Sequence, residues 1–268
     1  MAEQATLAQL ISLAGRRALI TGAAAGLGKA MARRFAEAGA DLELVDIAHD
    51  RLEAIVADLP DFGVEVHTHR VDLSRKEEID RLWQTWDDAH LPDILVNNAG
   101  IYPFEHFLDV NEDAYQRVLG INLSSVYWMC QHMISRRKRR KLGGVIINIG
   151  SIEAMLPFKM DLVHYSMSKA GVIALTRSLA KEYARHGFRI NVLIPGGILT
   201  AGTRAAARQL LRFKFGLIKE AWDFRQRLPA GRIGQPDEVA RMAVVLASDL
   251  ASYVHGASIP VDGGFLAS

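Results

Sequence analysis

The chain has 268 residues, enough to bury most of its apolar surface in one core, so we expect a single domain over residues 1–268 with residues 1–12 as an N-terminal tail. Lys and Arg (32) barely outnumber Asp and Glu (30), and a net charge of +2 gives no global argument for a nucleic-acid partner. The one cysteine, Cys130, excludes an internal disulfide, and we find neither a secretory signal nor an apolar run of membrane-spanning length. We therefore expect a soluble, cytoplasmic protein with no membrane partner.

Apolar, strand-like runs alternate along the chain with segments of helical period. The predicted strands are 17–20, 42–45, 64–71, 94–96, 145–149, 189–193 and 258–261, and the predicted helices are 29–38, 50–58, 75–89, 111–138, 165–186 and 236–248. Such alternation is typical of right-handed crossovers, a parallel sheet and helices on both faces. The predicted fold class is a doubly wound α/β sheet that binds its ligands beyond the carboxyl ends of the strands.

A glycine-rich turn follows the first predicted strand. It runs from Thr21 to Gly28, with Gly22, Gly26 and Gly28 as its glycines and Ala25 and Leu27 among the residues between them. Glycines at these places allow a tight turn, close approach of backbone N–H groups to a pyrophosphate, and close packing of the next helix, whose N-terminus attracts anions. The turn is a candidate dinucleotide site, although a plain strand-to-helix turn can have the same composition.

Asp46 ends the second predicted strand and is followed by Ile47. A carboxylate there can accept hydrogen bonds from ribose hydroxyls and repels a 2′-phosphate, which favours NAD over NADP. Arg51 and Lys29 are close enough in sequence to leave a phosphate site open.

Tyr165 and Lys169 stand four residues apart on a predicted helix, which puts a phenol beside an ammonium on one face. A fixed cation lowers the pKa of a phenol, ordinarily about 10, so the pair can serve as a tuned acid/base. The same spacing also occurs by chance on solvated helix faces, so the motifs elsewhere in the chain decide between the two interpretations.

These motifs together resemble the short-chain dehydrogenase/reductase family, in its compact form, from about residue 13 to residue 266. They are the glycine turn, Asp72 after the third strand, Asn97-Asn98-Ala99-Gly100 after the fourth, Asn122, Ser151, Tyr165-xxx-Lys169 and Pro195-Gly196, in the order and spacing of that family. The resemblance implies a Rossmann-type fold and hydride transfer between a nicotinamide cofactor and an alcohol or ketone. It also implies that helices 111–138 and 165–186 pair between subunits, giving a homotetramer or homodimer.

The resemblance assigns four catalytic residues. Tyr165 would exchange a proton with the substrate oxygen, Ser151 would hold that oxygen, and Lys169 would lower the pKa of the phenol and bind the nicotinamide ribose. Asn122 would take part in a water-linked proton relay to Lys169. The alternative is an exposed loop serine and a tolerated mid-helix asparagine.

The resemblance also assigns residues to the cofactor. Asp72 would accept from the adenine amino group, with Leu73 beside it, although Asp72 could instead cap the helix that begins near residue 75. The remaining assignments are Asn98, Ala99 and Gly100 on the adenosine side, Asn97 bracing the turn at Thr21, and Pro195, Gly196, Ile198 and Thr200 at the nicotinamide.

Substrate specificity is expected from the segments around these residues. They are Tyr102, Pro103 and Phe104, then Ile152, Glu153 and Ala154, residues 157–164, and a predicted amphipathic lid at 201–228 with arginines from Arg204 to Arg227. The basic face of the lid, and the basic run from Arg136 to Lys141, could bind an anionic substrate or carrier. Alternatively, the charges of the lid form a solvated helix face, and those of the run complement the dipole at the end of a helix. His67 and His69 could face the same way on a strand, but without a third ligand we expect no metal site.

The expected function is an NAD(H)-dependent oxidoreductase for a secondary alcohol or ketone, in particular a polyol, sugar or cyclic alcohol. The alternative is a 3-oxoacyl reductase that uses NADPH on a carrier-protein or coenzyme A thioester, which would give the basic runs a role. A third possibility, a dinucleotide-binding sensor or scaffold without turnover, is disfavoured because Ser151, Tyr165 and Lys169 are all present.

Overall fold

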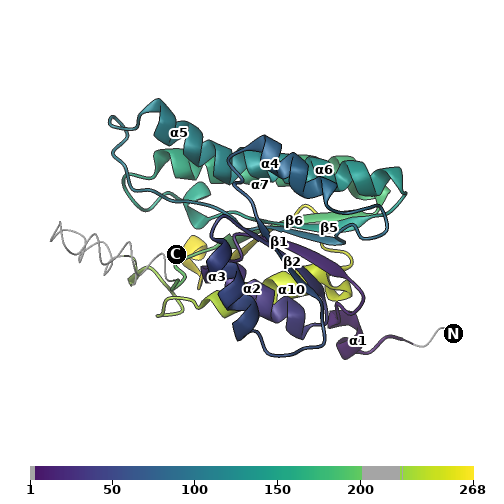
Figure 1. The fold of residues 1–268 in the computed structure, drawn as a ribbon. Coiled ribbons are helices and arrows are strands. Elements are labelled where there is room, and N and C mark those ends of the chain that lie inside the picture. The colour runs from purple at the N-terminus through teal and green to yellow at the C-terminus, as the bar shows by residue number, and fades with distance from the viewer. Residues whose placement is uncertain (1–3, 201–223, 225) are drawn as a thin grey trace.

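The computed structural model describes residues 4–200, 224 and 226–268, and within them a seven-stranded parallel sheet of order β3-β2-β1-β4-β5-β6-β7 forms the centre of the molecule (Figure 1). The strands are β1 (Arg17–Thr21), β2 (Asp41–Asp46), β3 (Val66–Arg70), β4 (Ile94–Asn97), β5 (Gly144–Ile149), β6 (Phe188–Pro195) and β7 (Ser258–Val261). The chain order reverses between β1 and β4, and ligands bind at such a reversal in open α/β sheets.

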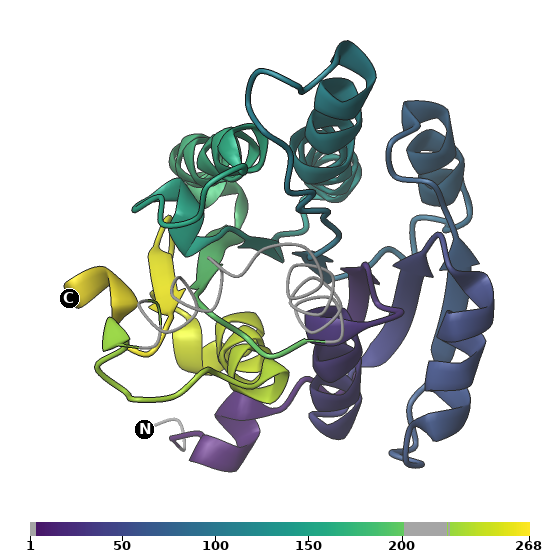
Figure 2. The same ribbon diagram turned by 90° about the vertical axis from the view of Figure 1, so that its left-hand side faces the viewer.

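Helices cover both faces of the sheet. They are α1 (Leu7–Ile11), α2 (Gly26–Glu37), α3 (His49–Asp58), α4 (Lys76–Gln84), α5 (Glu112–Leu119), α6 (Ser125–Arg139), α7 (Val163–Tyr183) and α10 (Pro236–Ala247). Figure 1 shows α4, α5, α6 and α7 on one face and α2, α3 and α10 on the other, and Figure 2 shows α2 and α10 side by side beneath the sheet. The predicted doubly wound fold class is confirmed.

The two faces of the sheet bury two separate cores, because side chains along each strand point alternately to either side. On β1, Ala18 and Ile20 belong to the core beneath α2 and α10, whereas Leu19 belongs to the core beneath α4 and α6. All four residues of β4 are buried, as expected for a strand that is covered on both faces. This double burial explains why Ile94, Leu95 and Val96 of β4 form an uninterrupted apolar run in the sequence.

Three predicted segments differ in the structure. The helix predicted over 75–89 ends at Gln84, because the Thr85 hydroxyl bonds the Leu82 carbonyl (2.7 Å) and the following residues turn around Asp87. The helix predicted over 111–138 is divided by one turn of π-helix, η1 (Gly120–Ser124). The predicted tail contains α1, whose first turn is closed by a capping box between Thr6 and Gln9. No helix in the described ranges has the length and apolar character needed to span a bilayer.

Candidate active site

The glycine turn between β1 and α2 has the geometry that a pyrophosphate requires. Gly22 has a left-handed φ of 66°, and a Cβ at Gly28 would overlap the Gly22 carbonyl oxygen, so both positions need glycine. The N-cap residue of α2, Ala25, makes no side-chain hydrogen bond to the first turn. The N–H groups at the positive end of this 12-residue helix, from Gly26 through Leu27 to Gly28, are therefore not capped by a side chain and suit an anionic group.

The Asn-Asn-Ala-Gly segment after β4 is fastened to this turn. The Thr21 hydroxyl oxygen accepts from the backbone N–H groups of Asn98 (3.0 Å) and Ala99 (3.1 Å), and the Asn98 side chain donates to the carbonyls of Thr21 (2.9 Å) and Gly22 (3.1 Å). The prediction that Asn97 braces Thr21 was wrong. Asn97 is the last residue of β4, and its buried side chain donates to Asn148 on the neighbouring strand β5 (2.8 Å), whereas Asn98, just beyond the strand, reaches Thr21.

Asp46 lies at the carboxyl end of β2, against the glycine turn. One carboxylate oxygen accepts from the N–H of Ala24 (3.0 Å) and the other from the N–H of Ala48 (3.0 Å), which fixes the carboxylate beside the turn. The neighbouring Ile47 side chain is 59% exposed and presents an apolar surface there. Two cations were considered as possible partners of a 2′-phosphate. Lys29 pairs with Asp58 (3.3 Å), and Arg51 is exposed on the first turn of α3.

Asp72 and Leu73 follow β3 and differ in environment. One oxygen of the Asp72 carboxylate accepts from both the N–H (3.0 Å) and the hydroxyl (2.7 Å) of Ser74, and so closes a local turn before α4. Leu73 is buried in the core beneath α4. The N-cap residue of α4 is Arg75, so Asp72 stabilises the approach to the helix rather than its first turn.

The segment after β6 returns to the glycine turn. Pro195 ends the strand, and Gly196 donates its N–H to Val261 on β7 (3.1 Å). Ile198 is buried and forms a parallel bridge with Gly234. A Cβ at Gly26 would lie 3.4 Å from the Thr200 methyl group, so Thr200 lies over the turn on which the pyrophosphate is expected.

Ser151 and Tyr165 meet at the carboxyl end of β5. Ser151 caps the 3-10 turn η2 (Ile152–Ala154) by accepting from the Glu153 N–H (3.2 Å), and it hydrogen-bonds the Tyr165 phenol. Because the Ser151 oxygen accepts from Glu153, one of its lone pairs is already used, and its proton can be directed to another oxygen. Tyr165 lies in the first turn of α7, as predicted.

The pKa of Tyr165 is raised to about 12, chiefly by burial, while the bond from Ser151 lowers it and the charges of Glu153 and Tyr102 raise it. The prediction of a lowered pKa was therefore wrong for this state of the site. The ammonium of Lys169 is buried, donates to the Ile149 carbonyl (2.8 Å), and has its own pKa lowered by burial to about 8.

Asn122 lies in η1, where the helix widens by one residue. Its side chain pairs with both backbone groups of Ile101, accepting from the N–H (2.8 Å) and donating to the carbonyl (2.8 Å), and also donates to the Ser168 hydroxyl (3.2 Å). The expected water-linked relay to Lys169 involves both the side chain and the backbone of Asn122, and in the structure the side chain holds the chain after Gly100. A Cβ at Gly100 would lie 3.3 Å from Asn122 Oδ1 and 3.4 Å from Lys169 Nζ, so the three residues converge.

Two further side chains stand next to Tyr165. The Tyr102 ring meets the Tyr165 ring edge-on at 6.2 Å and also contacts Phe104, and burial raises the pKa of Tyr102. His164 is buried, and neither of its ring nitrogens has a hydrogen-bond partner among the described residues. Of the residues predicted to set specificity, Tyr102 thus has its ring in contact with the ring of Tyr165.

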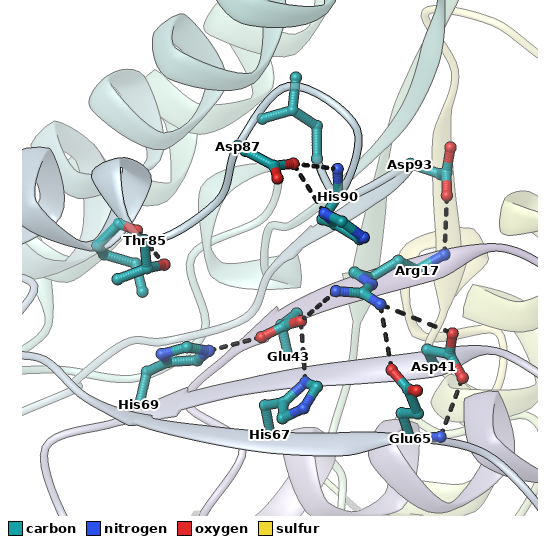
Figure 3. Close-up of polar contacts among 12 residues, drawn as sticks. Arg17, Asp41, Glu43, Glu65, His67, His69, Thr85, Asp87, His90 and Asp93 are labelled. Carbon is teal, nitrogen blue, oxygen red and sulfur yellow. Dashed lines mark hydrogen bonds and ion pairs between the residues drawn. The ribbon is translucent and has the colours of Figure 1, made fainter.

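His67 and His69 do face the same way, and both contact Glu43 (Figure 3). Glu43 is 2% exposed on β2 and accepts from Arg17 (3.1 Å), with His69 Nε2 at 2.6 Å and His67 Nδ1 at 3.2 Å. This Glu43 cluster, made of these four residues, is an ion-pair network at the far end of the sheet from Tyr165. In the described part of the chain no group of three or more His, Cys, Asp or Glu side chains is arranged to hold a metal ion.

The basic run at the end of α6 is largely used within the fold. Arg136 donates to the carbonyls of Trp83 and Trp86, and Arg137 is buried, donating to Gly143 (2.5 Å) and Pro92 (3.0 Å) and pairing with Asp93 (3.1 Å). Most of the predicted lid, with its arginines from Arg204 to Arg225, lies outside the described residues. Of that segment, the Arg227 guanidinium lies over the Phe265 ring at 5.1 Å.

Comparison with known proteins identifies the family. A family model described as Enoyl-(Acyl carrier protein) reductase matches residues 22–266. The 3-oxoacyl-acyl-carrier-protein reductase FabG of Chlamydia pneumoniae is 38% identical over 255 residues, 95% of this chain and 98% of that protein. The L-rhamnose 1-dehydrogenase (NAD(P)(+)) of Azotobacter vinelandii is 34% identical over 259 residues, 94% and 97% of the two chains.

A solved structure agrees with these relatives. A Beutenbergia cavernae protein described as an NAD(P) dependent gluconate 5-dehydrogenase, with bound NADP, has a TM-score of 0.88 at 33% identity and covers 97% of this chain and 100% of its own. The chain belongs to the short-chain dehydrogenase/reductase family. It is an NAD(P)-dependent oxidoreductase that acts on CH–OH groups. The expectation that NADP is the less favoured cofactor was wrong as far as the comparisons go, because similar structures contain bound NADP.

Two contributions to the site were missed by sequence reasoning. Ser168, between Tyr165 and Lys169, accepts from Asn122 and donates to the Tyr165 carbonyl (2.7 Å), which ties α7 to η1. Glu153 was considered only as a residue that might touch substrate, yet its carboxylate is directed at the backbone of the following loop. A serine and a glutamate in these segments carry no sequence signal for either role.

Proposed function

We propose that this enzyme transfers a hydride between NAD(H) and a secondary alcohol or ketone of the polyol, sugar or cyclic-alcohol class. The observation that carries the proposal is the carboxylate of Asp46, which is held rigidly beside the glycine turn by the N–H groups of Ala24 and Ala48. A 2′-phosphate at this place would meet a fixed negative charge, whereas ribose hydroxyls would meet an acceptor. The exposed Ile47 beside it offers an apolar surface for the adenine ring.

The residues of the site fit a dinucleotide along the whole crevice. The uncapped N-terminus of α2 would hold the pyrophosphate, Asp72, Leu73, Asn98, Ala99 and Gly100 would line the adenosine side, and Pro195, Gly196, Ile198 and Thr200 would hold the nicotinamide end. The bound cofactor supplies the hydride. The remaining roles belong to the backbone and side chains of the protein.

In ketone reduction, Tyr165 donates its phenolic proton to the substrate oxygen, and Ser151 donates a hydrogen bond to the same oxygen. In alcohol oxidation the Tyr165 oxygen accepts the proton instead. Lys169, whose ammonium lies near Gly100, would bind the nicotinamide ribose and would be the source of the proton that restores Tyr165. Asn122 holds Ile101, and therefore Tyr102, against the acid/base.

Fluorescence titration of the purified protein with NADH and with NADPH tests the cofactor. We expect tighter binding of NADH, and we expect Asp46→Asn to weaken it about 10-fold, the loss typical of a charged hydrogen bond. Asp50→Asn removes an exposed carboxylate nearby and should change neither affinity. Tighter binding of NADPH by the unmodified protein would contradict the assignment of Asp46.

The second candidate is reduction of a 3-oxoacyl thioester with NADPH. It is favoured by the 38% identity to a 3-oxoacyl-acyl-carrier-protein reductase. It is not favoured by the basic run of α6, since Arg136 and Arg137 are bound to backbone carbonyls. Tighter NADPH binding, with turnover of an acetoacetyl thioester and none of polyols, would place this candidate first.

A homotetramer or homodimer in the cytoplasm is part of the proposal. Tyr127 on α6 and Val163 and Met167 on α7 are exposed apolar side chains on the two helices expected to pair between subunits. Light scattering on the eluting protein measures the assembly directly, and a monomer would contradict this assignment.

A further inference from the structure

The hydroxyl group of Tyr102 is buried and has no hydrogen-bond partner among the residues that the structure describes. The rest of this side chain is only partly buried. A buried hydroxyl that is left unpaired destabilises a folded protein, and a phenylalanine would fill the same place without that cost. The Tyr102 hydroxyl is therefore a candidate group for recognition of a ligand.

The Tyr102 side chain extends from the acid/base toward the segment that follows β6. Its ring meets the Tyr165 ring edge-on, with 6.2 Å between the ring centroids. Thr200 acts on the hydroxyl from the other side, although the two groups form no hydrogen bond of normal geometry. Because Thr200 lies over Gly26 of the glycine turn, the Tyr102 hydroxyl lies between Tyr165 and the nicotinamide end of the proposed cofactor site.

The Tyr102 ring is held in this place before any ligand binds. The preceding residue, Ile101, is fixed through both of its backbone groups by the Asn122 side chain (2.8 Å each). The Phe104 ring packs edge-on against the Tyr102 ring at 6.3 Å. A donor that is held in position loses little freedom when it binds a ligand, so it can discriminate between ligands that differ by one polar group.

His164 is the other buried side chain near Tyr165 without a hydrogen-bond partner in the described part of the chain. On α7 it shares a face with Ser168, four residues further on, and Ser168 accepts from Asn122 in η1. His164 is therefore on the face of α7 that meets η1, whereas Tyr165 is on the next face. Of the two unpartnered groups, the Tyr102 hydroxyl is the one that a substrate at Tyr165 can reach.

The position of the reacting atoms decides which part of a substrate the Tyr102 hydroxyl meets. The substrate oxygen must lie at Tyr165 and Ser151, and the reacting carbon must face the nicotinamide. A hydroxyl between these two places lies beside the carbon next to the reacting carbon. A phenol both donates and accepts a hydrogen bond, and an alcohol on that neighbouring carbon does the same.

We propose that Tyr102 is a specificity-determining residue whose hydroxyl binds an oxygen on the carbon next to the reacting carbon, so that the preferred substrate is a vicinal diol or the corresponding α-hydroxy ketone. This inference rests on the proposed function and deepens it by naming the substrate class among the polyols, sugars and cyclic alcohols. A 3-oxoacyl thioester has no oxygen on the carbons next to its ketone and would leave the hydroxyl unpaired. Tyr102 keeps its own proton throughout, because Tyr165 exchanges the proton of the reaction.

The test compares three neutral alcohols on one ring: cyclohexanol, cyclohexane-1,2-diol in its cis and trans forms, and cyclohexane-1,3-diol. With the cofactor that binds more tightly, we expect one form of the 1,2-diol to exceed the other two alcohols in kcat/KM by about 10-fold or more. Tyr102→Phe should lower kcat/KM for that diol by about 10-fold, mainly through KM, and should leave cyclohexanol and the 1,3-diol within about twofold.

The stability of Tyr102→Phe separates ligand recognition from a structural role. Because the change removes a hydroxyl without a partner, the urea midpoint should stay the same or rise. A clear fall of the midpoint would mean that the hydroxyl is bonded within the protein, and it would overturn the proposal. Tyr253→Phe, which removes the hydroxyl of a fully exposed tyrosine, is the matched control and should change neither the kinetics nor the midpoint.

A binding measurement does not depend on turnover. Calorimetric titration of the enzyme with its reduced cofactor by cyclohexane-1,2-diol measures affinity alone, because a reduced cofactor accepts no hydride from an alcohol. Binding that is about 10-fold weaker in Tyr102→Phe supports the proposal, and equal affinities overturn it. If the unmodified enzyme oxidises cyclohexanol as well as the 1,2-diol, the proposed function stands and this inference fails. If it oxidises none of the alcohols, the proposed function fails, and this inference fails with it.

Discussion

The Asn122 side chain forms hydrogen bonds with both the N–H and the carbonyl of Ile101, the two bonds that a neighbouring strand would otherwise supply. The two bonds are 2.8 Å each, and Asn122 is fully buried. They hold the chain as it leaves the Asn-Asn-Ala-Gly segment and carry Tyr102 to the ring of Tyr165. We therefore propose that Asn122 supports catalysis by holding that segment in place.

We expect Asn122→Asp to lower the free energy of unfolding by about 2 kcal/mol, because a carboxylate can still accept from the Ile101 N–H but faces the Ile101 carbonyl without a proton to donate. kcat/KM should fall about 10-fold or more, since Tyr102 and Gly100 are no longer held. Urea denaturation and steady-state kinetics measure the two effects. Gln131→Ala, an exposed change on α6, is the control.

Asn122→Ala removes the two hydrogen bonds to Ile101 without adding a charge. It therefore separates the loss of these bonds from the repulsion that a carboxylate at this position would have with the Ile101 carbonyl. A variant that is as stable and as active as the unmodified enzyme would show that Ile101 is held by its other contacts.

Lys169 is expected to reduce stability while it supports activity. Burial lowers the pKa of its ammonium from 10.5 to about 8, so the unfolded chain binds more protons than the folded chain between those values. The free energy of unfolding should therefore rise as the pH increases from 8 toward 10. Lys169→Met should be more stable than the unmodified protein by about 1–2 kcal/mol at neutral pH, even though the Ile149 carbonyl loses its donor.

The difference between the two proteins should shrink toward pH 10, and Lys169→Met should have no measurable turnover. Chemical denaturation at several pH values gives the comparison. A less stable Lys169→Met variant at neutral pH would mean that the bond to Ile149 outweighs the cost of burying the charge.

The Glu43 cluster should make stability depend on acid pH. Burial raises the pKa of Glu43, but the hydrogen bonds and charges of His69 and His67 outweigh it, and the net pKa is below the ordinary 4.5. A carboxyl whose folded pKa is lowered contributes stability above its unfolded pKa and loses that contribution as the pH falls through the folded value.

We therefore expect Glu43→Gln to cost about 2 kcal/mol of unfolding free energy at neutral pH, because Arg17 and His69 lose a buried partner. The cost should diminish below pH 4.5. Glu65→Gln, which removes a far more exposed carboxylate that also pairs with Arg17, should have little effect. An equal cost at every pH would show that the charge of Glu43 is not what stabilises the cluster.

Sequence reasoning predicted the order of the elements because the sheet is buried on both sides. Ile94, Leu95 and Val96 have no exposed face, so their apolar run identifies a central strand without any knowledge of its neighbours. The glycine turn could also be predicted, because backbone atoms lie too close to Gly22 and Gly28 for a side chain at either position. These signals are local and survive in the sequence.

The missed features depend on contacts between distant segments. Nothing in the sequence tells which of Asn97 and Asn98 points to Thr21, because the answer depends on where β4 ends relative to the sheet. The environment of Tyr165 was misjudged because burial, which a sequence does not show, acts on its pKa more strongly than a cation one turn away. The contacts of Arg137 with Pro92 and Gly143 are likewise invisible in a run of basic letters.

The single widened turn at Gly120–Ser124 has a consequence for how the chain can change in length. One residue more or less in a continuous α-helix rotates everything on one side by about 100° relative to the other. Deleting one residue from this turn would leave a regular helix of unbroken hydrogen bonds, yet it would turn Asn122 away from Ile101 or α6 away from the sheet. The longest helical stretch of this face is therefore the place where a one-residue deletion would be tolerated least, and the loops between the elements are where the family can vary in length.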